Sequence, residues 1–143
     1  SDSFGILDTQ SAGGVFINTG DGVNRVEMTR VQITRIADLV ITTGLGQDNI
    51  KLDRVNVDDN CFIDTGLGND IFQLTNSRFT GLFDATLGGG NDSAYLSGNF
   101  FAVAPSGVDG GAGIFDALTL GAGNSPRNNM VNPNFETIRL KVL

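Results

Sequence analysis

The residues best suited to chemistry are aspartates that recur at a fixed spacing after glycine-rich stretches. Asp48, Asp70 and Asp92 hold the same place in successive stretches, and Asn24 holds it in an earlier one. If these stretches stack on one another, the carboxylates lie about 5 Å apart, and the unrelieved repulsion costs about 1–3 kcal/mol per neighbouring pair. We therefore expect a further interaction that offsets the repulsion.

Two interactions would serve, and the sequence leaves both open. Ca²⁺ takes about six to eight oxygen ligands and accepts carboxylates together with turn carbonyls. This interpretation predicts a metal-binding set of Asp48, Asp70, Asp92, Gly46, Gly68 and Gly90. In the alternative, each Asp or Asn accepts hydrogen bonds from backbone N–H groups one or two residues on, as in an Asx turn. Asn24 favours the second interpretation, because a neutral amide does the same task.

The histidine and cysteine counts argue against most catalytic sites. The chain has no His and one Cys, which excludes His-dependent triads, His-bearing zinc sites and an intrachain disulfide. We expect Cys61 to be a buried, inert thiol, because it replaces an inward apolar residue. We predict no catalytic residue and no cofactor other than calcium, and so a protein that is not an enzyme.

A repeat runs through most of the chain. The blocks TGDGVNRVEM, TGLGQDNIKL, TGLGNDIFQL and LGGGNDSAYL have their first glycines at Gly20, Gly44, Gly66 and Gly88, at spacings of 24, 22 and 22 residues. A weaker fifth block, GGAGIFDALTL, starts at Gly111 with one residue inserted before Asp116. Fixed periods of this length are typical of repeat architectures.

Within each period, apolar residues alternate with polar ones, which is the period of a β-strand. Each period carries about three such runs, too short for an ordinary sheet domain, so they must pair with the same run of the next coil. The sequence predicts an all-β, right-handed parallel β-solenoid with three faces, about 22 residues per coil and five to six coils. The coil of 24 residues has its extra residues around 34–37, where we expect a longer turn.

Composition bounds the domain organisation and the partners. With 143 residues, 40% of them hydrophobic and 17% charged, the chain fits one globular domain. We divide it into a partial first coil (1–19), four regular coils (20–109) and an irregular last coil with a terminal strand (110–143). The net charge of −7 makes nucleic acid a poor partner, and the longest apolar run is too short to span a membrane.

The stretches GLGND, GGGND and GGAGIFDALTL resemble the haemolysin-type (RTX) glycine-aspartate repeats, and the tail NFETIRL is similar to a strand of large bacterial surface proteins. The coil of 22 with three strands is similar to the parallel β-helix of pectate-lyase-like proteins. The first resemblance implies a calcium ion between equivalent turns of adjacent coils. Both imply a secreted bacterial protein, extracellular or on the cell surface.

An outward apolar stripe is the second candidate site. By parity, Phe16, Val40 and Phe62 point away from the core, and we expect Asp84 and Ser106 to continue their column. Exposed apolar stripes mark interaction surfaces. In the alternative, the 34–37 turn or the C-terminal tail covers the stripe. The predicted interface residues are Phe16, Val40, Phe62, Leu140 and Val142, the last two for end-to-end stacking of coils.

The leading functional hypothesis is an extracellular structural or adhesive module that self-associates, end to end or laterally, into a fibre or surface layer. The alternative is a calcium-stabilised polysaccharide-binding or lyase-like module, with a cell-surface polysaccharide as partner. Absent Trp and a single Tyr weaken the alternative, because sugar-stacking platforms need aromatic residues.

Overall fold

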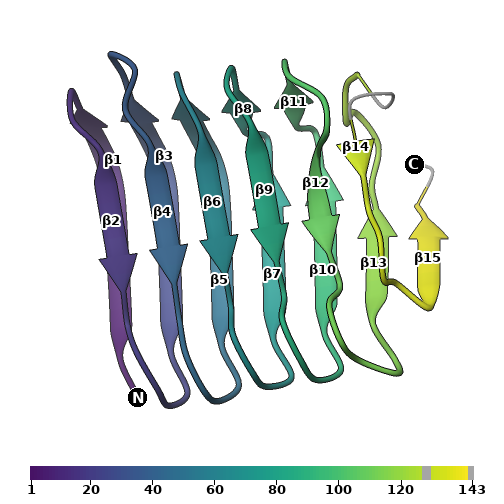
Figure 1. Ribbon diagram of the computed structural model, residues 1–143. Helices are drawn as coiled ribbons and strands as arrows, with labels where there is room; N and C mark the ends of the chain where they lie inside the picture. Colours follow the sequence, from purple (N-terminus) through teal and green to yellow (C-terminus); the bar gives the residue numbers. More distant parts are fainter. Residues whose placement is uncertain (127–129, 142–143) are drawn as a thin grey trace.

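The computed structural model describes residues 1–126 and 130–141, and all regular structure in these two ranges is β-strand (Figure 1). Successive coils lie side by side in chain order, with one row of strands in front and a second row behind it. The chain is a parallel β-solenoid of about 6 turns, roughly 22 residues apart, as the repeat predicts. No helix of the described residues is long and apolar enough to cross a membrane.

Two parallel sheets form the walls of the solenoid. The first contains, in spatial order, β1 (Ser3–Ser11), β3 (Arg25–Ile33), β5 (Asn49–Val57), β7 (Ile71–Thr75), β10 (Ser93–Ser97), β13 (Ala117–Leu120) and β15 (Thr137–Leu140), with β8 (Arg78–Phe79) and β11 (Phe100–Phe101) beside this path. The second contains β2 (Val15–Asn18), β4 (Leu39–Thr42), β6 (Cys61–Asp64), β9 (Phe83–Thr86), β12 (Ser106–Asp109) and β14 (Met130–Val131).

The first two apolar runs of each coil belong to one sheet, a detail that the alternation does not predict. In β3 and β5 they form a single strand of nine residues, with a left-handed residue at the junction: Arg30 has φ 53° and Arg54 has φ 54°. In the next two coils Asn76 and Gly98 occupy this place, with φ 52° and 70°, and the strand divides in two. A bend within a strand therefore replaces the expected turn.

The two extra residues of the 24-residue coil lie where the sequence places them. Partner residues are offset by 24 positions between β3 and β5 and by 22 between β5 and β7. The longer connection falls between β3 and β4, and its Ile36 is 85% exposed. Because this turn lies outside the stacked strands, the pairing above and below it is undisturbed.

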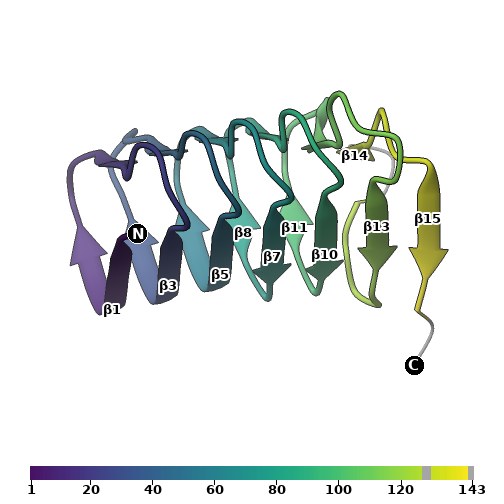
Figure 2. The same cartoon turned by 90° about the horizontal axis from the view of Figure 1, so that it is seen from below.

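The core consists of inward columns of side chains that run along the solenoid. They lie between the two rows of strands that Figure 2 shows from below. Val26, Ile50 and Phe72 form one column and Met28, Leu52 and Leu74 another, all fully buried. Phe79 and Phe83 of one coil and Phe101 of the next fill the space between the two sheets, with ring centroids 4.6–5.8 Å apart. These columns hold the glycine-aspartate turns and the outer face in register.

Candidate functional site

The predicted aspartates form a continuous buried column along the glycine-rich edge. Each side chain accepts, through Oδ1, the backbone N–H of the residue at the same place in the preceding coil. The donor–acceptor pairs are Asn24–Asp48 at 2.7 Å, Asp48–Asp70 at 2.8 Å, Asp70–Asp92 at 2.7 Å and Asp92–Asp116 at 2.7 Å. We call Asn24, Asp48, Asp70, Asp92 and Asp116 the aspartate column; all five are at most 2% exposed.

The column has a wider extent and a different bonding pattern than either sequence interpretation assumed. Asp116 belongs to it, and the residues beyond it follow the same rule: Asn24 Oδ1 accepts the N–H of Asp2, and Glu136 Oε2 accepts that of Asp116. The local Asx-turn bond is made instead by Asn18, Asp64 and Asp109, each of which accepts the N–H two residues on. The column aspartates therefore join coils instead of closing turns.

The geometry of this edge does not favour a calcium ion between successive turns. Backbone bonds already join the turns directly, with Leu67 N–H donating to Gly44 O at 3.0 Å and Gly46 N–H to Leu67 O at 2.7 Å. The backbones are so close that a Cβ on Gly68 would lie 1.6 Å from Gly46 O. In the described ranges, no group of three or more Asp, Glu, Cys or His side chains converges on a point. The calcium set of Asp48, Asp70, Asp92, Gly46, Gly68 and Gly90 stays a prediction that this geometry does not favour.

The outer face of the second sheet carries the apolar stripe. Phe16 pairs with Val40 and Val40 with Phe62 in the parallel register, so the three residues form one straight column. Phe16 is 73% exposed and Phe62 36%, while Val40 between them is half-buried. We call these three residues the outer column. Neither the 34–37 turn nor any other described segment covers it to the extent of burying Phe16.

Beyond Phe62 the column continues with Asp84, as expected, but then with Gly107 instead of Ser106. Ser106 is buried, and its Oγ accepts the N–H of Phe83. The expectation was wrong by one residue because the coil from Asp84 to its partner Gly107 has 23 residues, not 22.

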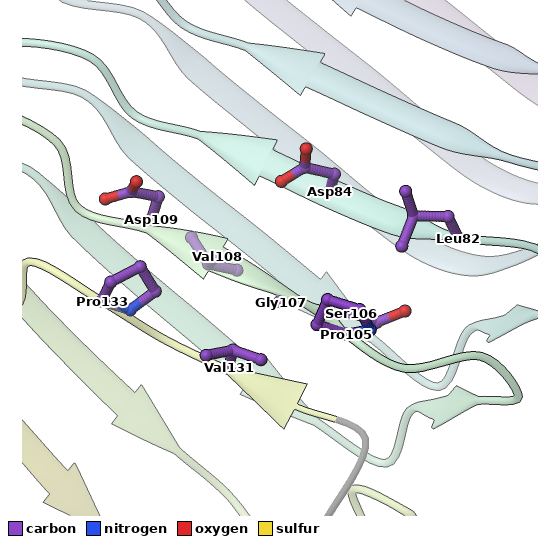
Figure 3. A pocket seen from close by; sticks show the side chains of 9 residues that line it. All are labelled: Leu82, Asp84, Pro105, Ser106, Gly107, Val108, Asp109, Val131 and Pro133. Atoms are coloured by element: carbon purple, nitrogen blue, oxygen red, sulfur yellow. The ribbon is translucent and has the colours of Figure 1, made fainter.

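A hollow of about 300 Å³ lies around Gly107, beside the outer column. Figure 3 shows Leu82 and Asp84 on one side of it and Val131 and Pro133 on the other, with Gly107 between. The lining within the described residues is largely apolar and carries two carboxylates, of Asp84 and Asp109. Asp109 Oδ1 is engaged by the N–H of Gly111 and by Asn134 Nδ2, so Asp84 is the carboxylate that the structure leaves for a ligand.

The remaining predicted residues lie apart from these features. Cys61 is fully buried in the inward column between Leu39 and Phe83, and burial raises the pKa of its thiol. Leu140 lies in register with Leu120 and is 63% exposed. Val142 lies outside the described residues.

Comparison of the chain with protein-family models, curated proteins and solved structures found no match. The class that sequence and fold define is the parallel β-solenoid. The haemolysin-type resemblance rests on the motif residues alone.

Proposed function

We propose that this chain is an extracellular structural and adhesive module that associates laterally with a second copy through the outer column. One observation carries the proposal. Phe16, Val40 and Phe62 form an exposed apolar column on a sheet whose neighbouring strands pair in register. A contiguous exposed apolar stripe on a rigid wall is typical of a protein–protein contact.

The order of residues in the outer column suits pairing with an identical copy. The sequence Phe–Val–Phe reads the same in both directions, so a two-fold axis at Val40 places Phe16 of one copy against Phe62 of the other. Two-fold interfaces are self-complementary in this way. The adjacent outward column on these strands is polar, with Asn18, Thr42 and Asp64, and a polar rim around an apolar centre is the usual anatomy of an interface.

The experiment is sedimentation velocity with light scattering over a range of concentrations. The proposal predicts concentration-dependent association of the wild type and its loss in Phe16→Ser/Phe62→Ser. The matched control is Leu45→Ser/Leu67→Ser, which removes two other exposed, stacked apolar residues, 55% and 58% exposed, from the turn edge. A wild type that stays monomeric, or equal loss in both variants, would contradict the proposal.

Polysaccharide binding is the second candidate, and the hollow at Gly107 is the observation that favours it. Its apolar walls and the Asp84 carboxylate suit the faces and hydroxyls of a sugar. Titration with bacterial cell-surface polysaccharides would show binding that Asp84→Ala weakens, since the hollow then lacks the carboxylate that would accept from a sugar hydroxyl. End-to-end stacking through Leu140 and Val142 remains a prediction, and so does the extracellular location.

A further inference from the structure

Four oxygen atoms of the aspartate column have no hydrogen-bond partner. They are the Oδ2 atoms of Asp48, Asp70, Asp92 and Asp116, each buried inside the turn of its own coil. A buried acceptor without a donor is costly, and an ionised carboxylate without one is more costly still. Four repetitions of the same deficit indicate a feature of the column rather than a local fault.

Asn24, the neutral member of the aspartate column, shows which hydrogen bonds the four Oδ2 atoms lack. Asn24 Oδ1 accepts the N–H of Asp2, as every column residue accepts from the coil before it. Its other side-chain atom, Nδ2, donates to Gly20 O at 2.8 Å and to Gly22 O at 3.1 Å. The glycines of later turns stack directly on these two, Gly44 on Gly20 and Gly46 on Gly22. The stacking places equivalent carbonyls in each later turn, and carbonyls accept but cannot donate. At Asp70 the Thr65 hydroxyl, which donates to Leu87 O at 2.7 Å, also interacts with the carboxyl and lowers its pKa against the larger effect of burial.

A protonated carboxyl reproduces the Asn24 pattern, since it has one O–H donor and one acceptor oxygen, whereas a carboxylate only accepts. The charges around the column oppose ionisation as well. Neighbouring aspartates stack at the strand spacing of about 4.8 Å, Asp21 touches the turn at Gly44, and Glu136 ends the column. Arg25 lines a surface hollow with Asp48 but is already paired with Glu27 at 2.7 Å, and the amino group of Ser1 lies at the Gly22 turn, beside the Asn24 rung.

We propose that the aspartate column is a proton-binding site, in which Oδ2–H groups donate to the carbonyls of the glycine-rich turns as Nδ2 of Asn24 does. Burial raises the pKa of Asp70, and it raises that of Asp92 to about 6, with the neighbouring carboxylates Asp70 and Asp116 adding to the effect. Because neighbouring rungs interact, the protons of Asp70 and Asp92 leave in coupled steps.

The proposal fixes the sign of the pH dependence. Asp70 and Asp92 bind their protons more tightly in the folded chain than in the unfolded chain, so their stabilising contribution is complete below the unfolded pKa of about 3.9. The contribution is lost as the pH rises through the folded value, about 6 for Asp92. Each unit of pKa difference corresponds to about a tenfold change in the unfolding equilibrium constant. The solenoid is therefore more stable in mild acid than at higher pH.

The test is the unfolding equilibrium of the full chain in urea between about pH 5 and pH 8, without added metal. This window lies above the unfolded pKa of Glu27, whose own pKa is lowered to about 2 by Lys51 and Arg25 and so changes stability only at lower pH. We expect the wild type to lose stability as the pH rises. Asp92→Asn should flatten this slope and be more stable than the wild type at the upper end of the window.

Two further variants and one direct measurement complete the experiment. Asn24→Asp should steepen the slope by adding a rung, and Asp58→Asn, at an exposed position, should leave it unchanged. Should Asn24→Asp fail to fold, infrared or carbon NMR spectra of the folded wild type near pH 5 still decide, since they should show protonated carboxyls that Asp92→Asn reduces. A flat wild-type profile, or spectra with every carboxyl ionised, would overturn the proposal. Stabilisation by calcium that Asp92→Asn abolishes would also overturn it, in favour of a metal site.

Discussion

The backbone N–H of Asp48 donates to Oδ1 of Asp70 across 22 residues of chain, at 2.8 Å. One side chain thus fixes the backbone of the coil before it. Val55 N–H to Ser77 Oγ and Ser77 N–H to Asn99 Oδ1 repeat the device at the bend, both at 3.0 Å. Side-chain oxygens therefore supply, at the corners, the coil-to-coil bonds that backbone carbonyls supply along the strands.

Replacing Asp70 by Ala should destabilise the solenoid by about 1–3 kcal/mol, because the buried N–H of Asp48 loses its acceptor. Urea unfolding at about pH 5, below the folded pKa of about 6 for Asp92, measures the difference with least charge repulsion along the column. Asp58→Ala is the matched control, since Asp58 is exposed, and its effect should stay within about 0.5 kcal/mol. Equal effects of the two substitutions would mean that the inter-coil bond contributes nothing.

The inward columns make a second prediction. Leu74→Ala should cost about 2–5 kcal/mol, since Leu74 is fully buried between Leu52 and Leu96 and its truncation leaves a cavity. Leu45→Ala, at a residue 55% exposed on the turn edge, should cost far less. Thermal unfolding followed by circular dichroism distinguishes them. Similar melting temperatures for both variants would show that the parity of the strands is misassigned.

The third prediction concerns the close stacking of the glycine-rich turns. Gly68 has φ 153°, and an added Cβ would lie 1.6 Å from Gly46 O, so Gly68→Ala must push two coils apart. We expect a loss of at least about 2 kcal/mol, in the range of strained or overpacked sites. Gly13→Ala is the control, because a Cβ there meets nothing within 4 Å. A Gly68→Ala variant as stable as Gly13→Ala would contradict the stacking of the turns.

Strand parity made most of the fold predictable from the sequence. Val26, Met28 and their counterparts alternate strictly, and a parallel stack converts that alternation into columns with no freedom of register. The left-handed bend at Arg30 and Arg54 was not predictable, because Arg carries no signal for positive φ. The sequence therefore did not predict that two of the three expected faces form a single sheet.

The site was predictable in its residues and not in its chemistry. The spacing identified Asp48, Asp70 and Asp92, but the donor to each carboxylate lies a full coil away, and no local pattern shows it. Counting by 22 also failed after Asp84, since one extra residue before β12 moves the outer column from Ser106 to Gly107. A local insertion shifts every later position of a periodic count, although the stacked coils accommodate the extra residue without losing their pairing.

The most direct test of lateral self-association is disulfide crosslinking of Val40→Cys under mild oxidation. The two-fold axis at Val40 brings this position next to its own copy, and the native Cys61 is fully buried and does not interfere. Asp84→Cys is the control, because it lies in the same column two rungs from the axis and has no counterpart opposite it. The proposal predicts a covalent dimer that forms quickly with Val40→Cys and slowly with Asp84→Cys. Equal rates for the two variants, or no dimer from Val40→Cys, would contradict it.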